Sequence, residues 1–238
     1  MKAILHLPGS GKQRGFSLVE MMIGITLGSV LLLALAYYYV GSRQLNRTHD
    51  DVSRMQESGR NALEILGRAI RQTGYRANLG AFTGALAGTN GSPDTITVQY
   101  NAQAVVGEAN CAGVIVAAGG LMTHAFTVNA GTRTLLCNGN VVANNIEDMQ
   151  ITYGIDTPPQ NGVIALYTAT PTAAQFGQVF AVPGEVAAVR INLLVRGPTR
   201  NAATGNQTYL FNGAPGPTGD GFLRQVYTVT FTVRNQAG

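Results

Sequence analysis

Glu20 is the side chain of this 238-residue sequence whose position most clearly demands a chemical partner. It stands in an otherwise apolar run that begins at Phe16, and the twenty residues from Met21 to Val40 that follow it are uncharged. A carboxylate at the centre of a bilayer costs roughly 2.5 to 3.5 kcal/mol, and less near an end, so an ionisable group in such a segment is by default a functional one. We therefore expect Glu20 to meet a cation.

Cleavage of the chain between Gly15 and Phe16 would create that cation. The new α-amino group would lie one helical turn before Glu20. A carboxylate near the N-terminus of a helix is also favoured by about 0.3 to 1 kcal/mol, because the positive end of the helix dipole lies there. The segment therefore predicts a processing site followed by an acid that binds an amine.

The chain contains two cysteines, Cys111 and Cys137. In an exported domain they are expected to form a disulfide, which would close a loop of about 27 residues and stabilise the fold by roughly 3.5 kcal/mol on the chain-entropy estimate. Buried free thiols are the alternative. A zinc site is not expected, because two cysteines without nearby histidines supply half of the usual ligands at best.

No set of catalytic side chains accompanies these residues. The chain has three histidines: His6 precedes the apolar run, His49 follows it in a segment expected to be helical, and His124 lies in a possible strand. None of them has a constellation around it, and His124 is expected to be a surface or hydrogen-bonded sheet residue. Asp220 stands between two glycines and indicates a turn. With no phosphate loop or cofactor fingerprint, we expect no catalytic, metal or cofactor site; an anchored enzyme is the alternative.

The formal charge of +4 is concentrated at the N-terminus. It arises from 16 basic and 12 acidic residues, and Lys2, Lys12 and Arg14 precede the apolar run, so the remainder carries 13 minus 12, or +1. The positive-inside rule puts this basic leader in the cytoplasm and the residues from about 41 onward outside. From Ala77 onward six arginines face seven acidic residues, so binding of nucleic acid is not expected.

One long helix is predicted from the leader to the start of the C-terminal region. As a helix, Met21–Val40 would be about 30 Å long and would span a bilayer once. Between Leu45 and Ile70 apolar residues recur with a period near 3.6, which indicates an amphipathic helix. No proline interrupts Phe16–Tyr75, and Gly74 is placed to end the helix as a C-cap.

Beyond Ala77 the patterns are those of strands and turns. Alternating apolar residues predict four strands, at Thr95–Tyr100, Met149–Ile155, Val189–Val195 and Tyr227–Val233, with shorter ones at 114–116, 125–128, 134–137 and 163–166. Two stretches, Gly80–Pro93 and Pro198–Gly221, indicate loops. An antiparallel sheet packed on the second half of the helix would bury one apolar face of each, which predicts an α+β fold.

The residues around the cleavage point resemble a known processing signal. Residues 12–22, KQRGFSLVEMM, resemble the class III signal of type IV pilins and of type II secretion pseudopilins. The resemblance implies that a membrane peptidase cuts after Gly15 and N-methylates Phe16, and that Glu20 pairs with the N-terminal amine of a neighbouring subunit. A secretory signal cleaved before Tyr37 and an uncleaved anchor are the alternatives, which N-terminal sequencing separates.

The C-terminal region resembles the PilW family of minor pilins. The segments that carry this resemblance are 68–76, 145–156, 189–196 and 224–235. It implies the lollipop-shaped pilin fold. A cleaved cytoplasmic leader, 1–15, precedes a helix, 16–76, with its transmembrane part at 16–40, and a β-rich head follows at 77–238.

The family resemblance also implies a role. Such minor pilins sit with other minor pilins in a complex that primes type IV pilus assembly, caps the tip and supports twitching motility and adhesion. The implied partners are the prepilin peptidase/N-methyltransferase, the major pilin and the inner-membrane assembly platform. The chain would be a single-pass inner-membrane protein with a periplasmic head and then part of the pilus. A J-type pseudopilin of a type II secretion system is the alternative, and a DNA-binding pilin is disfavoured by the charge balance.

Overall fold

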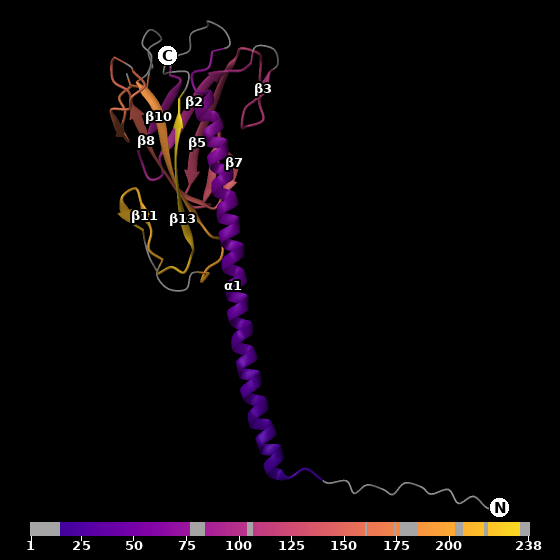
Figure 1. The fold of residues 1–238 in the computed structure, drawn as a ribbon. Coiled ribbons are helices and arrows are strands. Elements are labelled where there is room, and N and C mark those ends of the chain that lie inside the picture. Colours follow the sequence, from indigo (N-terminus) through magenta and orange to yellow (C-terminus); the bar gives the residue numbers. More distant parts are fainter. Residues whose placement is uncertain are drawn as a thin grey trace, which may run out of the picture. The chain divides into compact units, whose positions relative to one another are not determined.

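The computed structural model describes residues 15–76, 84–103, 107–159, 161–173, 175–176, 185–202, 207–216 and 219–233. The chain divides into two compact units, Met1–Asn46 and Arg47–Gly238. Helix α1 (Leu18–Gln72) begins in the first unit and ends in the second. Every strand of the described residues belongs to the second unit (Figure 1).

The described part of the first unit is the start of α1 and the residues before it. The Ser17 carbonyl accepts a hydrogen bond from the Met21 N–H at 3.1 Å, so Ser17 occupies the N-cap position, where serine is favoured. The apolar stretch of α1 is long enough to cross a membrane, and none of its most apolar window is buried. The helical structure of this segment therefore follows from its local sequence, without packing against other described residues.

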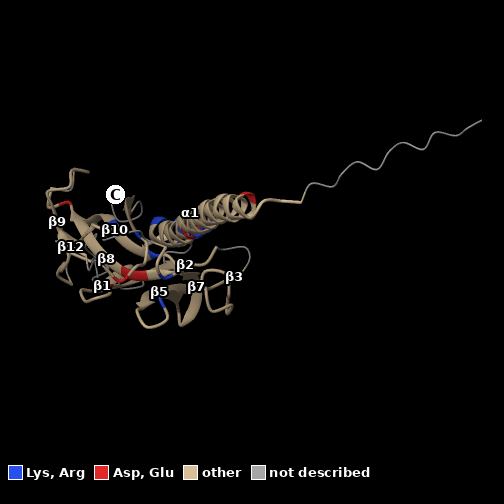
Figure 2. Ribbon diagram, turned by 90° about the horizontal axis from the view of Figure 1, so that it is seen from below, with Lys and Arg blue, Asp and Glu red and all other residues tan. Residues whose placement is uncertain are grey.

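Within the second unit α1 buries one face and exposes the other. Its buried residues there include Met55, Ala62, Leu66 and Ile70, which follow the helical period. Acidic and basic residues share the exposed positions (Figure 2). The helix ends at Gln72, and Gly74 has a φ of 76°, so the predicted glycine C-cap is confirmed.

Most strands belong to two antiparallel sheets. The five-stranded sheet has the order β1-β2-β5-β6-β7, with β1 (Leu86–Thr89), β2 (Thr95–Asn101), β5 (Leu121–Asn129), β6 (Thr134–Cys137) and β7 (Asn140–Asn144). The four-stranded sheet has the order β13-β10-β8-β9, with β8 (Ile146–Ile155), β9 (Leu166–Thr168), β10 (Val186–Arg196) and β13 (Arg224–Thr232). Two small hairpins join β3 (Glu108–Ala109) to β4 (Ile115–Val116) and β11 (Leu210–Phe211) to β12 (Ala214–Pro215).

The structure confirms the α+β class and the four long strands, and it corrects three details. The single expected sheet is two sheets, because alternation identifies a strand but not its neighbours. The expected loops 80–93 and 198–221 contain β1 and the β11–β12 hairpin. These strands are short and contain glycine, proline or no alternation, so pairing rather than local pattern makes them strands. β9 begins at Leu166 rather than near 163.

One apolar core joins α1 to both larger sheets. Its fully buried members come from all three elements and include Leu66, Ile70, Ile96, Leu135, Ile151 and Ile191. Burial of each such side chain contributes about 1.5 to 3 kcal/mol. This core includes Cys137 at the end of β6, and Cys111 packs against it.

Two rings of β13 pack directly on the α1 backbone. A Cβ added at Gly59 would lie 2.6 Å from Cε2 of Tyr227, and one added at Gly67 would meet Cε1 of Phe231. A side chain at either position would force the ring to shift. Glycine at these two helical positions therefore sets how closely the helix approaches the strand, at the usual cost of glycine in a helix.

Candidate functional site

Glu20 lies in the first turn of α1, three residues after the N-cap Ser17. Between Gly15 and Ser42 it is the only side chain with a full charge at neutral pH. Its neighbours are exposed apolar side chains, among them Phe16 at 87% exposure and Leu18 at 76%. The structure brings the predicted residues into one short segment that begins before the helix.

No described residue provides a charged partner for Glu20. The ion pairs among the described residues all lie in the second unit. The spacing of Ser17 and Glu20 is that of a capping box, in which a glutamate or glutamine at this place supports the helix N-terminus. A capping role explains the residue's size and polarity, and the helix dipole favours its charge by about 0.3 to 1 kcal/mol, but neither supplies the cation expected for an acid in lipid.

Gly15 has no folding role that the structure reveals. A Cβ added there would meet nothing within 4 Å, and no left-handed φ marks the position. Gly74 and Gly67, in contrast, are required by a positive φ and by an aromatic ring. The glycine before Phe16 is therefore explained by something other than the fold.

The second candidate site lies in the second unit, where Cys111 and Cys137 form a disulfide with a Cα–Cα distance of 5.8 Å. This confirms the predicted bond. Cys137 ends β6, and Cys111 lies in the hairpin between β3 and β4. The bond therefore fastens this hairpin to the five-stranded sheet.

His124 on β5 lies beside this disulfide, which corrects the expectation that no constellation surrounds it. Its Nδ1 is 3.1 Å from Sγ of Cys111 and 3.7 Å from Sγ of Cys137, and its Nε2 is 3.2 Å from Oη of Tyr100. A histidine therefore does lie near the two cysteines, whereas the expectation that they form no zinc site assumed that none did. Phe126 pairs with Cys137, so His124, two residues before Phe126 on β5, is a diagonal neighbour of Cys137 on the same face of the sheet. The turn between β5 and β6 sets this pairing and was the sequence signal that could have indicated it.

The hydrogen bonds identify the tautomer of His124. Disulfide sulfurs can only accept, so Nδ1 carries the proton and donates to Cys111, while Nε2 accepts from the Tyr100 hydroxyl. Burial lowers the pKa of His124, which favours this neutral form. Burial, and then the nearby Glu108 carboxylate, raises the pKa of Tyr100 to about 12, so its hydroxyl stays protonated.

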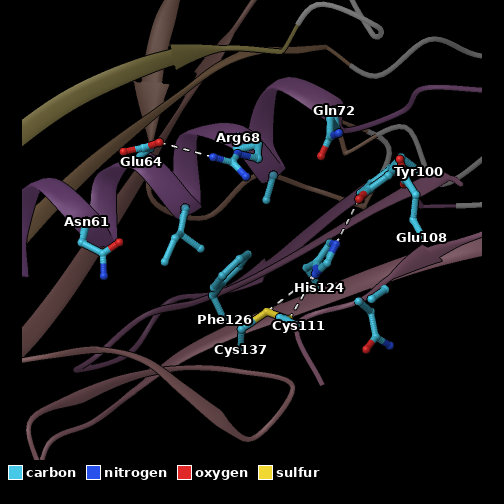
Figure 3. A pocket seen from close by; sticks show the side chains of 14 residues that line it. Asn61, Glu64, Arg68, Gln72, Tyr100, Glu108, Cys111, His124, Phe126 and Cys137 are labelled. Carbon is cyan, nitrogen blue, oxygen red and sulfur yellow. Dashed lines mark hydrogen bonds and ion pairs between the residues drawn. A yellow bond between two sulfur atoms is a disulfide. The ribbon is translucent and has the colours of Figure 1, made fainter. Parts of the chain in front are cut away.

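A cavity of about 530 Å³ lies over His124 and the disulfide, between α1 and the five-stranded sheet (Figure 3). On the helix side its lining includes Glu64 and Arg68, an exposed ion pair at 3.3 Å. The His124 ring stacks between the rings of Tyr100 and Phe126, with centroid distances of 5.6 and 6.3 Å. The cavity thus combines charged groups, a stacked imidazole and the sulfur atoms.

A separate charged cluster surrounds Arg224, whose side chain is 3% exposed. Its guanidinium binds Glu147 at 2.6 Å and Asp220 at 2.6 Å. Hydrogen bonds from Arg224 hold the pKa of Asp220 below its usual range. Asp220 also accepts from the Phe222 N–H at 3.1 Å, which agrees with the predicted turn. This cluster fixes the residues before β13.

Comparisons with known proteins match both ends of the chain. A family described as Type IV Pilus-assembly protein W matches residues 110–235, and the prokaryotic N-terminal methylation motif matches residues 10–36. No curated protein sequence matches. Among solved structures, a type IV-like pilin from Thermus thermophilus is similar in fold with a TM-score of 0.57 and 18% identity, covering 78% of this chain and 98% of that one.

Proposed function

The chain belongs to the Type IV Pilus-assembly protein W family, and from this we propose that it is a minor pilin, a structural subunit incorporated at or near the tip of a type IV pilus. With other minor pilins it primes assembly and supports twitching motility and adhesion. The methylation motif at residues 10–36 and the pilin-like fold support this proposal. The unpartnered Glu20 of the first unit is the observation that carries it.

Processing at Gly15 and Phe16 is the first step. A prepilin peptidase/N-methyltransferase cuts after Gly15 and methylates the new N-terminus of Phe16. Two observations support this: the motif spans both residues, and the fold has no need of a glycine at position 15. Both residues also precede the start of α1, so the cut lies outside the helix.

Glu20 then docks the subunit. Its carboxylate binds the N-terminal amine of a neighbouring pilin as the two helices associate. The support is energetic: an acid among exposed apolar side chains is costly in lipid, and a charge-assisted hydrogen bond contributes about 1.5 to 3 kcal/mol. An amine from another subunit offsets a cost that no described residue of this chain relieves.

Before assembly the chain spans the inner membrane once with its head in the periplasm, and afterwards it is part of the pilus. The single membrane-length helix supports this topology, as does the excess of positive charge before it. The partners in assembly are other minor pilins, the major pilin and the inner-membrane assembly platform. They meet the chain through its exposed apolar helix.

Substitution of Glu20 by glutamine tests the docking role. Glu20→Gln keeps a side chain that can complete a capping box but removes the charge, whereas Glu20→Ala removes both. We expect both variants to be cleaved and methylated normally, as N-terminal sequencing and mass spectrometry measure, and pilus assembly to fall more than tenfold in both. Normal piliation with Glu20→Gln would reduce the residue to a helix cap and contradict docking by charge.

A deletion strain separates the pilus from a secretion pseudopilus. Loss of surface pili and of twitching, with protein secretion unchanged, is the result expected for a minor pilin. Loss of protein secretion with normal twitching would instead identify a pseudopilin. Complementation with the Glu20→Gln variant in the same strain connects either phenotype to the proposed docking residue.

A further inference from the structure

The second unit brings together three side chains of a kind that binds soft metal ions. The ligand atoms of Cys111, His124 and Cys137 all lie within 4.8 Å of one another. Two thiolates and an imidazole are ligands that zinc accepts, and zinc sites with three protein ligands keep a fourth position for water. In the disulfide form the two sulfurs are bonded to each other, so only the dithiol form offers this set.

We propose that the dithiol form of the chain binds one zinc-class divalent ion through Sγ of Cys111, Sγ of Cys137 and Nδ1 of His124. A tetrahedral zinc ion with usual bond lengths requires about 3.6 Å between sulfur and nitrogen and about 3.8 Å between the sulfurs. The observed sulfur-to-nitrogen distances are 3.1 and 3.7 Å. Side-chain rotation parts the sulfurs, and the fourth position faces the cavity of about 530 Å³.

The surroundings suit a bound cation. Metal-bound histidines usually hold their second nitrogen in a hydrogen bond that orients the ring, and the Tyr100 hydroxyl lies 3.2 Å from Nε2 of His124. When Nδ1 binds the ion, the imidazole proton resides on Nε2, and this N–H donates a hydrogen bond to Oη of Tyr100. Oε2 of Glu108, in the wall of the same cavity, is buried and lacks a hydrogen-bond partner among the described residues. Its negative charge favours a cation nearby.

The two forms exchange by balanced steps. Two thiols, or one dithiol, supply two electrons and two protons to the Cys111–Cys137 bond, give two cysteine thiols and become a disulfide themselves. Zinc then displaces both thiol protons to solvent. A disulfide oxidant reverses the process and releases the ion. Because a new chain is made with reduced cysteines, the ion would hold the β3–β4 hairpin beside β6 before the bond closes.

Titration of the full chain, purified in detergent and reduced with a phosphine, tests the site. We expect one equivalent of Zn²⁺ to bind with release of about two protons, and Co²⁺ to give thiolate-to-metal absorption. The unreduced chain should show neither. His124→Ala should weaken Zn²⁺ binding at least tenfold with the count of two reactive thiols unchanged, whereas His49→Ala, at an exposed helical position, should leave it unchanged.

Three outcomes would overturn the proposal. They are a reduced chain that keeps its circular dichroism spectrum but binds no Zn²⁺, a reduced chain that unfolds without binding it, and a His124→Ala variant that binds as tightly as the unchanged protein. Because the unreduced His124→Ala chain retains its disulfide, its fold can be checked first. The measurements use purified protein and do not depend on the pilus role.

Discussion

The two units treat a charged side chain in opposite ways. In the first, Glu20 stands among exposed apolar side chains with no charged partner from the described chain. In the second, Arg224 is almost fully buried and two carboxylates, Glu147 and Asp220, bind its guanidinium. The second unit satisfies the charge of Arg224 internally, whereas the apolar part of α1 leaves Glu20 without a charged partner among the described residues. The first arrangement suits assembly and the second suits folding.

Glycines show the same contrast. Gly24, Gly28 and Gly41 on the first part of α1 have nothing within 4 Å of an added Cβ, whereas Gly59 and Gly67 on the second part lie against aromatic rings. The glycines of the first group lie on an uncovered surface, whereas those of the second group are covered by packed side chains. If the first unit is a surface for other subunits and the second is self-contained, substitutions in the two units should change different measurements.

The largest effect on the head is expected from loss of Arg224. Arg224→Met leaves Glu147 partly buried without its main partner, and removal of one member of a buried ion pair costs about 3 to 5 kcal/mol. Chemical denaturation of the head measures this loss in the free energy of unfolding. The matched control is Arg43→Met in the first unit, where the guanidinium lies 4.5 Å from the Tyr39 ring. Equal losses in the free energy of unfolding for both variants would contradict the contrast between the two units.

A smaller effect is expected from a methyl group at Gly67. Gly67→Ala places Cβ against the Phe231 ring, and overpacking of a core typically costs about 1 to 3 kcal/mol. Gly41→Ala adds the same methyl group to open space, so the head should unfold at an unchanged denaturant concentration. If Gly67→Ala proved as stable as the unchanged chain, the close helix–strand packing would not constrain this position.

The smallest effect concerns pH and His124. Burial lowers its pKa, so below about pH 6.5 the unfolded chain binds a proton that the folded chain does not. Stability is therefore fully present above pH 6.5 and is lost as the pH falls toward the lowered pKa of the folded state, by at most about 1.4 kcal/mol per pH unit. Denaturation between pH 7 and 5 measures this slope.

The His124→Gln variant should show a smaller slope over that range, because its side chain does not titrate. His49→Gln serves as the control, since His49 is exposed on α1 and should leave the slope as it is. The range stops at pH 5 to limit the contribution of carboxyl groups, among which burial raises the pKa of Asp148 and the hydrogen bonds from Arg224 lower that of Asp220. Identical slopes in all three chains would mean that His124 is not protected from protonation.

Much of the fold could be predicted because its signals are local. The helix appears in the sequence as an unbroken apolar run followed by a 3.6-residue period, and its end is indicated by Gly74. Alternation indicated β2, β8, β10 and β13. β1, β3, β7 and the β11–β12 hairpin were missed, because their residues become strands only through pairing. The candidate site at Glu20 could be predicted for the same reason: its context is its own neighbours in the chain.

By itself the sequence determined the N-terminal methylation motif, the membrane-length helix and the position of Glu20 among apolar residues, because partition into a membrane and helix formation depend on composition within a few turns. Only the tertiary structure decided that His124 lies beside Cys111 and Cys137 and that most of the strands form two larger sheets. Those facts depend on register and on contacts between residues distant in the chain. A shift of one residue in the pairing of β5 with β6 would turn His124 and Cys137 to opposite faces.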